Sequence, residues 1–203
     1  MNQPFLRTAE LSDIDQIHTL MESIFGFYPN LDEVFAQWIS NDHYNVVLAQ
    51  FHEKIIGVST WCLKQDIDFL PYESFGKQAI DFLTSHKLAW VLNLAVYPEY
   101  RRNKIGEQLS LVQIKWMKER DCTAVAGTSW VNGTADNSQH LYFKAGFQQL
   151  GVSKDFLRLQ MQNGALCSVC KTSGCSCLSI LYAIQTEDLL KISSKKLYFF
   201  ATR

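Results

Sequence analysis

The sequence predicts a single α/β domain in which helices pack on a β-sheet, and three observations support this class. The chain has 203 residues, 47% of them hydrophobic and 19% charged, with only 10 Gly and 4 Pro, a composition typical of a globular protein with a buried core. Residues 46–63 contain two β-branched and aromatic runs around a polar triplet, which predicts a hairpin. Residues 89–128 follow the order strand, loop, helix, strand, which is a βαβ unit.

The first forty residues are expected to form a strand and two helices. Residues 5–8 have the composition of a short strand, and Ser12 or Asp13 can cap the helix that follows. Apolar residues recur at helical spacing over 14–24 and again over 31–39, with a Pro-Asn pair between the two runs. These stripes are expected to face the core.

The hairpin and an irregular segment come next. The hairpin strands are expected at 46–51 and 55–63, where β-branched and aromatic residues dominate. Residues 64–87 show only a weak pattern, interrupted by Pro and Gly, so we expect an irregular excursion with a short helix at 78–83.

The βαβ unit should supply the centre of the sheet. Its first strand is the apolar run 89–96, its helix begins at Ile105 and stops near Asp121, and its second strand covers 123–128. A shorter helix capped by Asp136 or Asn137 follows and ends before a Gly suited to a left-handed position. The remaining expected strands cover residues 157–161, residues 178–184 and, as a strand or a packed tail, residues 197–200.

Domain organisation and charge exclude several classes of protein. We find no internal repeat or linker, so one domain is expected over 1–203, with a cysteine-rich loop inserted at 163–178. The 19 Lys and Arg residues against 20 Asp and Glu leave a net charge of −1, without the basic excess of a nucleic-acid or membrane-surface protein. The N-terminus has no export-signal pattern, and the apolar run 88–96 is shorter than the roughly 20 residues of a membrane helix. We therefore expect a cytoplasmic protein that binds neither nucleic acid nor membranes.

The loop after the strand at 89–96 is the first candidate binding site. A strand-to-helix loop presents unpaired backbone N–H groups at the positive end of the helix dipole, which favours anions. Arg101 and Arg102 add positive charge, and Gly106 has no side chain where a phosphate would approach the backbone. By spacing alone, a phosphate site and a surface turn with solvated arginines are both open.

Two segments resemble motifs of the GNAT N-acetyltransferase superfamily. Residues 94–106, LAVYPEYRRNKIG, resemble motif A, whose signature is Arg/Gln-x-x-Gly-x-Gly/Ala after a strand. Residues 137–147, NSQHLYFKAGF, resemble the later helix of that family with its Leu-Tyr-x-x-x-Gly-Phe pattern. The resemblance covers roughly residues 5–160. It implies a mixed, twisted sheet of about six to seven strands with a splayed central parallel pair and flanking helices.

The resemblance implies transfer of an acetyl group from acetyl-CoA to an amine, and it assigns binding residues. Backbone groups of the strand would bind the pantetheine arm, at Leu94, Ala95 and Val96. Loop N–H groups would bind the pyrophosphate, at Arg102, Asn103, Lys104, Ile105, Gly106 and Glu107, with Arg101 at the first position of the signature. Asn137 would bond the pantetheine arm, with helix capping as an equal alternative.

One loop residue departs from the family pattern. The first Gly of the signature is Lys104 here, so either the loop tolerates a side chain at this position or its backbone follows another path. A lysine can reach a phosphate as a point charge, or it can mark a weakened cofactor site.

The resemblance also assigns the catalytic acid. Tyr142 falls at the family's general-acid position, where a phenol with a pKa of about 10 can give a proton to the departing thiolate. The alternative is a tyrosine that packs against Phe143 and Phe147. The backbone N–H of Val96 would polarise the carbonyl. The strand at 89–96 has no carboxylate to act as base, so a water chain or another segment must serve.

Four cysteines lie within eleven positions near the C-terminal end of the sequence. Cys167, Cys170, Cys175 and Cys177 have a spacing that suits a tetrahedral structural zinc site, although the second pair is tighter than Cys-x-x-Cys. Unligated or redox-active thiols and an iron–sulfur cluster are the alternatives. Cys62 and Cys122 are isolated and expected to be buried.

Two functions follow from the motifs. The first is an N-acetyltransferase that joins acetyl-CoA to a primary amine, which could be a small molecule, a peptide N-terminus or a lysine. The second is a catalytically weak CoA-binding sensor or interaction protein, suggested by Lys104 and by the missing strand carboxylate. The sequence leaves open whether the chain assembles as a homodimer.

Overall fold

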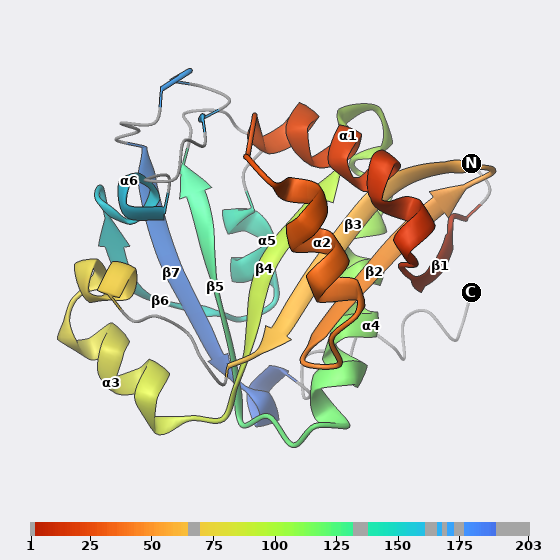
Figure 1. The fold of residues 1–203 in the computed structure, drawn as a ribbon. Helices are drawn as coiled ribbons and strands as arrows, with labels where there is room; N and C mark the ends of the chain where they lie inside the picture. Colours follow the sequence, from red (N-terminus) through yellow and green to blue (C-terminus); the bar gives the residue numbers. More distant parts are fainter. Residues whose placement is uncertain are drawn as a thin grey trace. The chain divides into compact units, whose positions relative to one another are not determined.

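A computed structural model describes residues 3–64, 70–131, 138–160, 166–167, 170–172 and 177–189. The strands form a seven-stranded mixed sheet in the order β1-β2-β3-β4-β5-β7-β6, with one parallel pair and flanking helices (Figure 1). The α/β class predicted from the sequence is therefore confirmed. The chain divides into a first unit, Met1–Leu63 with Val91–Trp116 and Met161–Cys175, and a second unit, Lys64–Trp90 with Met117–Gln160 and Ser176–Arg203.

The described elements match the order that the sequence predicts at most positions. The strands are β1 (Phe5–Thr8), β2 (Tyr44–Phe51), β3 (Lys54–Leu63), β4 (Leu88–Val96), β5 (Ala124–Val131), β6 (Gln148–Ser153) and β7 (Leu178–Gln185). The α-helices are α1 (Ile14–Phe25), α2 (Leu31–Ile39), α3 (Lys77–Ser85), α4 (Ile105–Lys118), α5 (Gln139–Lys144) and α6 (Phe156–Gln160). Short 3-10 turns are η1 (Leu11–Asp13), η2 (Leu70–Phe75) and η3 (Pro98–Tyr100).

In the first unit, the β2–β3 hairpin carries apolar side chains on both faces. Val46 and Leu48 pack with the buried residues of α1 and α2, whereas Val47 and Ala49 pack with Ile105 and Leu109 of α4. Because successive strand residues point to opposite faces, the continuous apolar run of β2 reflects burial on both sides.

A buried polar side chain also joins α4 to the hairpin. Gln113 is fully buried, and its Nε2 donates to the carbonyl oxygens of Asn45 at 3.0 Å and Ser59 at 2.8 Å. Its Oε1 accepts a hydrogen bond from the Asn45 side chain at 2.9 Å. Since every polar atom of this amide is paired, burial carries no desolvation penalty for an unmet hydrogen bond.

In the second unit, β5, β7 and β6 form an antiparallel arrangement. β5 and β7 pair along their whole length, from Ala124 opposite Gln185 to Val131 opposite Leu178. β6 pairs with β7 through a bulge between Gln149 and Gly151. The sheet order thus places β7, the last strand among the described residues, between β5 and β6, and the strand or tail predicted at 197–200 lies outside the described residues.

The predicted strand at 157–161 is wrong, because residues Phe156–Gln160 form helix α6 and the strand is β6. The reason is a local cap. The Ser153 Oγ accepts hydrogen bonds from the backbone N–H groups of Asp155 at 3.1 Å and Phe156 at 3.0 Å, which starts a helix at this point. β6 has the sequence QQLGVS, in which polar residues and a Gly take the place of the β-branched residues that predict a strand.

The structure defines two helix ends that the sequence predicted, the start of α1 and the end of α4. Asp13 stands at the N-cap position of α1, yet its carboxylate accepts hydrogen bonds from the Arg7 guanidinium at 2.7 Å and from the Glu10 N–H at 2.8 Å instead of capping α1. The hydrogen bonds from Arg7 hold the pKa of Asp13 below its usual value. The stop near Asp121 is confirmed, since Asp121 has φ 52° and its N–H and that of Cys122 bond back to Lys118 and Met117.

Among the described residues, no helix combines the length and the apolar character needed to cross a bilayer.

Candidate functional site

The predicted phosphate loop lies in the first unit, between the end of β4 and the start of α4. The Tyr97 N–H donates to the Ile56 carbonyl at 3.1 Å, and the turn η3 is closed by hydrogen bonds from Tyr100 to Tyr97 and from Arg101 to Pro98. Arg101 also reaches back to the strand, because its Nε donates to the carbonyl oxygen of Val96 at 3.0 Å. The loop therefore leaves β4 along a path that backbone and guanidinium hydrogen bonds fix.

The backbone of the loop shows how a lysine occupies the glycine position of the motif. Lys104 has φ 61° and Arg102 has φ 64°, both in the left-handed region that favours glycine. The loop therefore carries side chains at two positions whose backbone conformation favours glycine. A non-glycine residue in this region costs about 1–2 kcal/mol of conformational energy.

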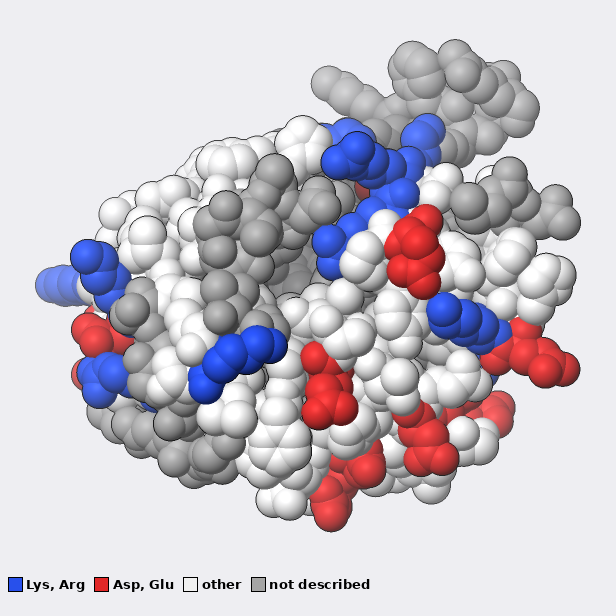
Figure 2. All heavy atoms as spheres, turned by 90° about the horizontal axis from the view of Figure 1, so that it is seen from above, with Lys and Arg blue, Asp and Glu red and all other residues white. Residues whose placement is uncertain are grey.

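The start of α4 has the properties of an anion site. The first intrahelical bond runs from the Gln108 N–H to the Lys104 carbonyl at 3.0 Å, so the N–H groups of the first turn have no acceptor within the helix. Arg102, Asn103 and Lys104 are exposed. Figure 2 shows the molecule from above, which is the side on which α4 begins in Figure 1, and several Lys and Arg side chains lie close together on this face. Positive charge and helix dipole therefore act in the same direction.

An apolar anchor holds this loop against the sheet of the first unit. Ile105 and Leu109 are 3% and 0% exposed and pack with Val47, Ala49 and Ile56. A glycine in β3 permits the close approach: a Cβ at Gly57 would lie 3.2 Å from the Ala95 carbonyl oxygen and 3.3 Å from Leu109. The anchor buries the helix start, while the residues before it stay at the surface.

The strand residues predicted to bind pantetheine alternate between the two faces of the first unit. Ala95 is buried with the residues of α1 and α2, whereas Leu94 and Val96 are partly buried and pack with the α4 cluster. Backbone hydrogen bonds leave such side chains free to pack, so core packing and a backbone role are compatible.

The predicted catalytic tyrosine lies in the second unit, on α5. Tyr142 is 8% exposed, and its ring stacks on Tyr182 of β7 with centroids 4.8 Å apart and meets Phe147 edge-on at 5.0 Å. Its hydroxyl lies 3.5 Å from the carbonyl oxygen of Thr128, which is at the limit of a hydrogen bond. Packing against Phe147 is thus observed, while Phe143 is 59% exposed.

The surroundings of Tyr142 keep its hydroxyl protonated. Burial, with a smaller contribution from Tyr182, raises the pKa of Tyr142 well above its usual value. Tyr182 is itself fully buried, its pKa is also raised by burial, and its hydroxyl has no hydrogen-bond partner among the described residues. Tyr182 could not be recognised from the sequence, because an aromatic residue within an apolar strand gives no signal beyond core packing.

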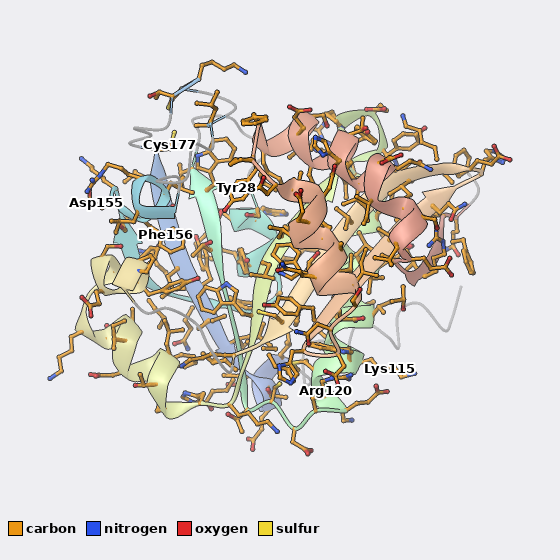
Figure 3. The ribbon with its side chains drawn as sticks, in the orientation of Figure 1. Tyr28, Lys115, Arg120, Asp155, Phe156 and Cys177 are labelled. Atoms are coloured by element: carbon orange, nitrogen blue, oxygen red, sulfur yellow. The ribbon has the colours of Figure 1, made fainter. Side chains whose placement is uncertain are left out.

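The predicted metal ligands that the structure describes fall in both units. Cys167 and Cys170 belong to the first unit, where the Cys170 N–H donates to the Cys167 Sγ at 3.4 Å, and Cys177 belongs to the second, where Figure 3 labels it at the start of β7. Cys175 and Asn137 lie outside the described residues. Cys62 and Cys122 are buried as predicted, and burial raises the pKa of the Cys62 thiol to about 12.

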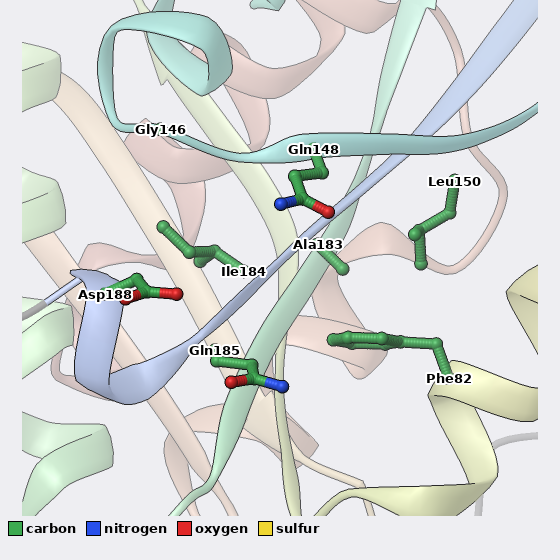
Figure 4. A pocket seen from close by; sticks show the side chains of 8 residues that line it. All are labelled: Phe82, Gly146, Gln148, Leu150, Ala183, Ile184, Gln185 and Asp188. Carbon is green, nitrogen blue, oxygen red and sulfur yellow. The ribbon is translucent and has the colours of Figure 1, made fainter.

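A pocket in the second unit does not coincide with any predicted site residue. Figure 4 shows side chains from α3, from β6 and from β7 with the residues after it around this pocket. Its lining consists of Phe82, Gly146, Gln148, Leu150, Ala183, Ile184, Gln185 and Asp188. One carboxylate and two amides supply its polar side chains, a set that points to no particular reaction.

A comparison with models of known protein families identifies the family of the chain. The model of the acetyltransferase (GNAT) family matches residues 12–147. The chain belongs to the GNAT acetyltransferase family. This match spans β4, the loop, α4 and α5, the segments that carried the resemblance in the sequence.

Relatives of this GNAT chain are distant in sequence. It is 22% identical over 152 residues, 74% of this chain and 85% of the relative, to a Bacillus subtilis protein provisionally named a ribosomal protein bS18-alanine N-acetyltransferase. The Escherichia coli ribosomal-protein-S18-alanine N-acetyltransferase has TM-score 0.59 and 15% identity, over 90% of this chain and 93% of that one. Arabidopsis thaliana NAA60, solved with acetyl-CoA, has TM-score 0.64 and 17% identity, over 89% of this chain and 97% of that one. The two structures share the fold.

Proposed function

We propose that this GNAT chain transfers an acetyl group from acetyl-CoA to a primary amine. The observation that carries the proposal is the loop before α4, where two residues in the left-handed region lead into a helix whose first turn lies beside exposed cations. That arrangement suits a pyrophosphate, which carries negative charge and accepts several N–H hydrogen bonds.

The binding roles extend the same argument. In this proposal Arg102, Asn103, Lys104, Ile105, Gly106 and Glu107 surround the pyrophosphate, with Arg101 holding the loop on the strand through Val96. Leu94, Ala95 and Val96 present backbone groups to the pantetheine arm, and Asn137 adds a side-chain hydrogen bond. The binding energy comes mainly from main-chain groups, so it depends on backbone conformation more than on side-chain identity.

The chemistry is a direct attack. The unprotonated amine nitrogen attacks the thioester carbonyl carbon, the C–S bond breaks, and the N–C bond of the amide forms. Tyr142 gives its hydroxyl proton to the departing thiolate, and the amine proton passes to water. Burial keeps Tyr142 in the protonated form that this role requires.

The acceptor is a primary amine, and a peptide N-terminus is the first class to test. Several relatives are named as ribosomal-protein-alanine N-acetyltransferases, and these names make an N-terminal alanine the first acceptor to test. An aminoglycoside 6'-acetyltransferase has the same fold at TM-score 0.59, so small-molecule amines belong in the same panel.

Calorimetry with acetyl-CoA tests the cofactor part of the proposal. We expect binding of one acetyl-CoA per chain, much weaker binding of S-acetylpantetheine, which lacks the pyrophosphate, and an affinity for acetyl-CoA that falls with added salt. Equal affinities for the two thioesters would exclude the pyrophosphate role of the loop. Release of free CoA thiol with Ala-peptides, lysine peptides and aminoglycosides then identifies the acceptor.

Zinc binding by the cysteines is a separate part of the proposal. The four-cysteine spacing in the sequence and the hydrogen bond from the Cys170 N–H to the Cys167 Sγ support it. A zinc ion with four thiolates has no open coordination position, so its role would be structural.

A further inference from the structure

Lys54, the first residue of β3, lies beside the turn η3 that leads into the predicted phosphate loop. Its Nζ is 4.5 Å from the centre of the Tyr97 ring and 5.4 Å from the centre of the Tyr100 ring. The same Nζ is 3.4 Å from Glu99 Oε1. A cation within about 6 Å of an aromatic ring is attracted to the negative face of that ring. Lys54 therefore contacts the residue before the turn, its middle and its end.

The two tyrosines connect the turn to apolar clusters on different faces of the first unit. Tyr97 packs with the cluster formed by α1 and α2, whereas Tyr100 packs with the cluster that contains Ile105 and Leu109 of α4. Both tyrosines are half-buried, and Lys54 is exposed. Because its ammonium group contacts both rings, Lys54 links the two sides of the turn.

The start of β3 is itself held by α1. Gln16 Oε1 accepts a hydrogen bond from the Ile55 N–H at 2.9 Å, and Gln16 Nε2 donates to the Glu53 carbonyl oxygen at 3.3 Å. These two bonds hold the residues on either side of Lys54. The backbone that carries the lysine is therefore a fixed support for the turn.

Side-chain hydrogen bonds connect the turn to the phosphate loop. Asn103 Nδ2 donates to the carbonyl oxygens of Tyr100 and Arg101, at 3.1 Å each. Asn103 stands between Arg102 and Lys104, the two loop residues in the left-handed region. A movement of η3 therefore moves the backbone N–H groups to which the proposed function assigns the pyrophosphate.

We infer that Lys54 is a positioning residue for the phosphate loop: its ammonium group holds η3, and through Asn103 the loop, in the conformation that binds the pyrophosphate of acetyl-CoA. The inference rests on the proposed function and adds to it a residue from outside the motif. Lys54 acts through Tyr97 and Tyr100, without a contact to the ligand. A cation–ring contact at an exposed site changes an equilibrium constant by about twofold to fivefold, which sets the size of the expected effect.

Calorimetry with acetyl-CoA and S-acetylpantetheine tests the inference. Lys54→Met keeps most of the aliphatic chain and removes the cation, whereas Tyr97→Leu keeps the cation and removes the nearer ring. Each variant should bind acetyl-CoA about twofold to fivefold more weakly and bind S-acetylpantetheine, which lacks the pyrophosphate, as the wild type does. The double variant should lose no more affinity than either single variant, because both changes remove the same contact.

Three control variants separate positioning from the charge of the lysine. Lys54→Arg keeps a cation beside the rings and should bind acetyl-CoA as the wild type does. Glu99→Gln removes the ion pair and keeps the cation–ring contact, so it should show no loss of affinity. Lys115→Met removes the same charge from the last turn of α4, about 15 Å along the helix from its start, and should also show no loss. The loss in Lys54→Met should persist at a salt concentration that screens distant charges.

The outcomes distinguish this inference from the proposed function. If the wild type binds both thioesters equally, the pyrophosphate site fails and the role of Lys54 fails with it. If the wild type prefers acetyl-CoA while Lys54→Met binds it unchanged, the role of Lys54 is wrong and the pyrophosphate site stands. A loss in Lys54→Met that is absent from Tyr97→Leu, or that disappears with added salt, means that Lys54 acts by its charge alone and overturns the positioning role. Lys54 is exposed, so its variants change no buried group and should retain the fold.

Discussion

The loop before α4 and the surroundings of Tyr142 solve different chemical problems in different ways. The loop is exposed, carries three cations among residues 101–104 and places two non-glycine residues in the left-handed region. Tyr142 is buried between aromatic rings, and its hydroxyl lies 3.5 Å from the backbone carbonyl oxygen of Thr128. In the proposed function, the first region supplies main-chain donors to an anion and the second holds a single proton.

This difference sets what a substitution can reveal. Most side-chain substitutions leave binding by main-chain N–H groups intact, whereas a change of backbone conformation weakens it. A proton donated by one hydroxyl is lost when a substitution removes that oxygen atom. Variants that alter one region and leave the other unchanged therefore separate the two contributions.

The largest effect is expected for Tyr142→Phe. Removing the proton donor should lower kcat by roughly 10²–10⁴-fold, the usual contribution of a general acid, with the affinity for acetyl-CoA unchanged. The raised pKa of Tyr142 also predicts that its ionisation causes no loss of kcat as the pH rises toward about 10. Steady-state kinetics across pH, with calorimetry for acetyl-CoA, measures both quantities.

Tyr182→Phe is the matched control, since it deletes the same atom from the ring that stacks on Tyr142. The Tyr182 hydroxyl has no hydrogen-bond partner among the described residues. The variant should therefore keep its activity and be more stable than the wild type, with a free energy of unfolding that is larger by about 1–2 kcal/mol. Equal losses of kcat in the two variants would mean that Tyr142 contributes through packing alone.

A smaller effect is expected where β3 approaches the end of β4. Gly57→Ala would place a Cβ 3.2 Å from the Ala95 carbonyl oxygen, so the free energy of unfolding should fall by about 1–3 kcal/mol. The displaced strand should also bind acetyl-CoA more weakly. Denaturant unfolding and calorimetry measure the two effects. Ser59→Ala, on the same strand, removes an Oγ that has no hydrogen-bond partner in the described part of the chain, and it should leave the affinity for acetyl-CoA unchanged. A matching loss of affinity in this variant would mean that the effect of Gly57→Ala does not come from the contact with Ala95.

The smallest effect concerns the glycine position of the motif. Lys104→Gly and Lys104→Ala both remove the charge, and only the glycine variant relieves the left-handed conformation at φ 61°. The glycine variant should therefore be more stable than the alanine variant by about 1 kcal/mol. Both should bind acetyl-CoA somewhat more weakly than the wild type if the lysine contacts phosphate. Equal stabilities would mean that the backbone relaxes around residue 104.

The sequence was most informative where a pattern has one structural solution. The apolar run of β2 can only be buried on two faces, and the helical stripe of α1 needs a core beside it. It failed at residues 157–161, where the apolar residues suit either structure and the Ser153 Oγ decides for a helix through two hydrogen bonds. Local capping by a residue outside the apolar run is invisible to a count of hydrophobicity.

The candidate site divides in the same way. Arg101 and Gly106 resemble two positions of the family signature because they lie close together along one loop, and the resemblance remains although Lys104 replaces the first glycine. Phe147 is close to Tyr142 along the chain, and packing between the two was predicted. Thr128 of β5 and Tyr182 of β7 are distant in the sequence, so no local spacing predicts the stack on Tyr182 or the raised pKa of Tyr142.

The sequence by itself determined the order of most strands and helices, the positive charge of the loop and the cysteine spacing, because each depends on residues that are close along the chain. Only the tertiary structure decided that Lys104 has a backbone conformation that favours glycine, that Tyr142 is buried against Tyr182, and that Leu166 is bonded to Phe27. Those properties depend on dihedral angles, burial and hydrogen bonds between distant segments, and these are fixed only when the chain has packed.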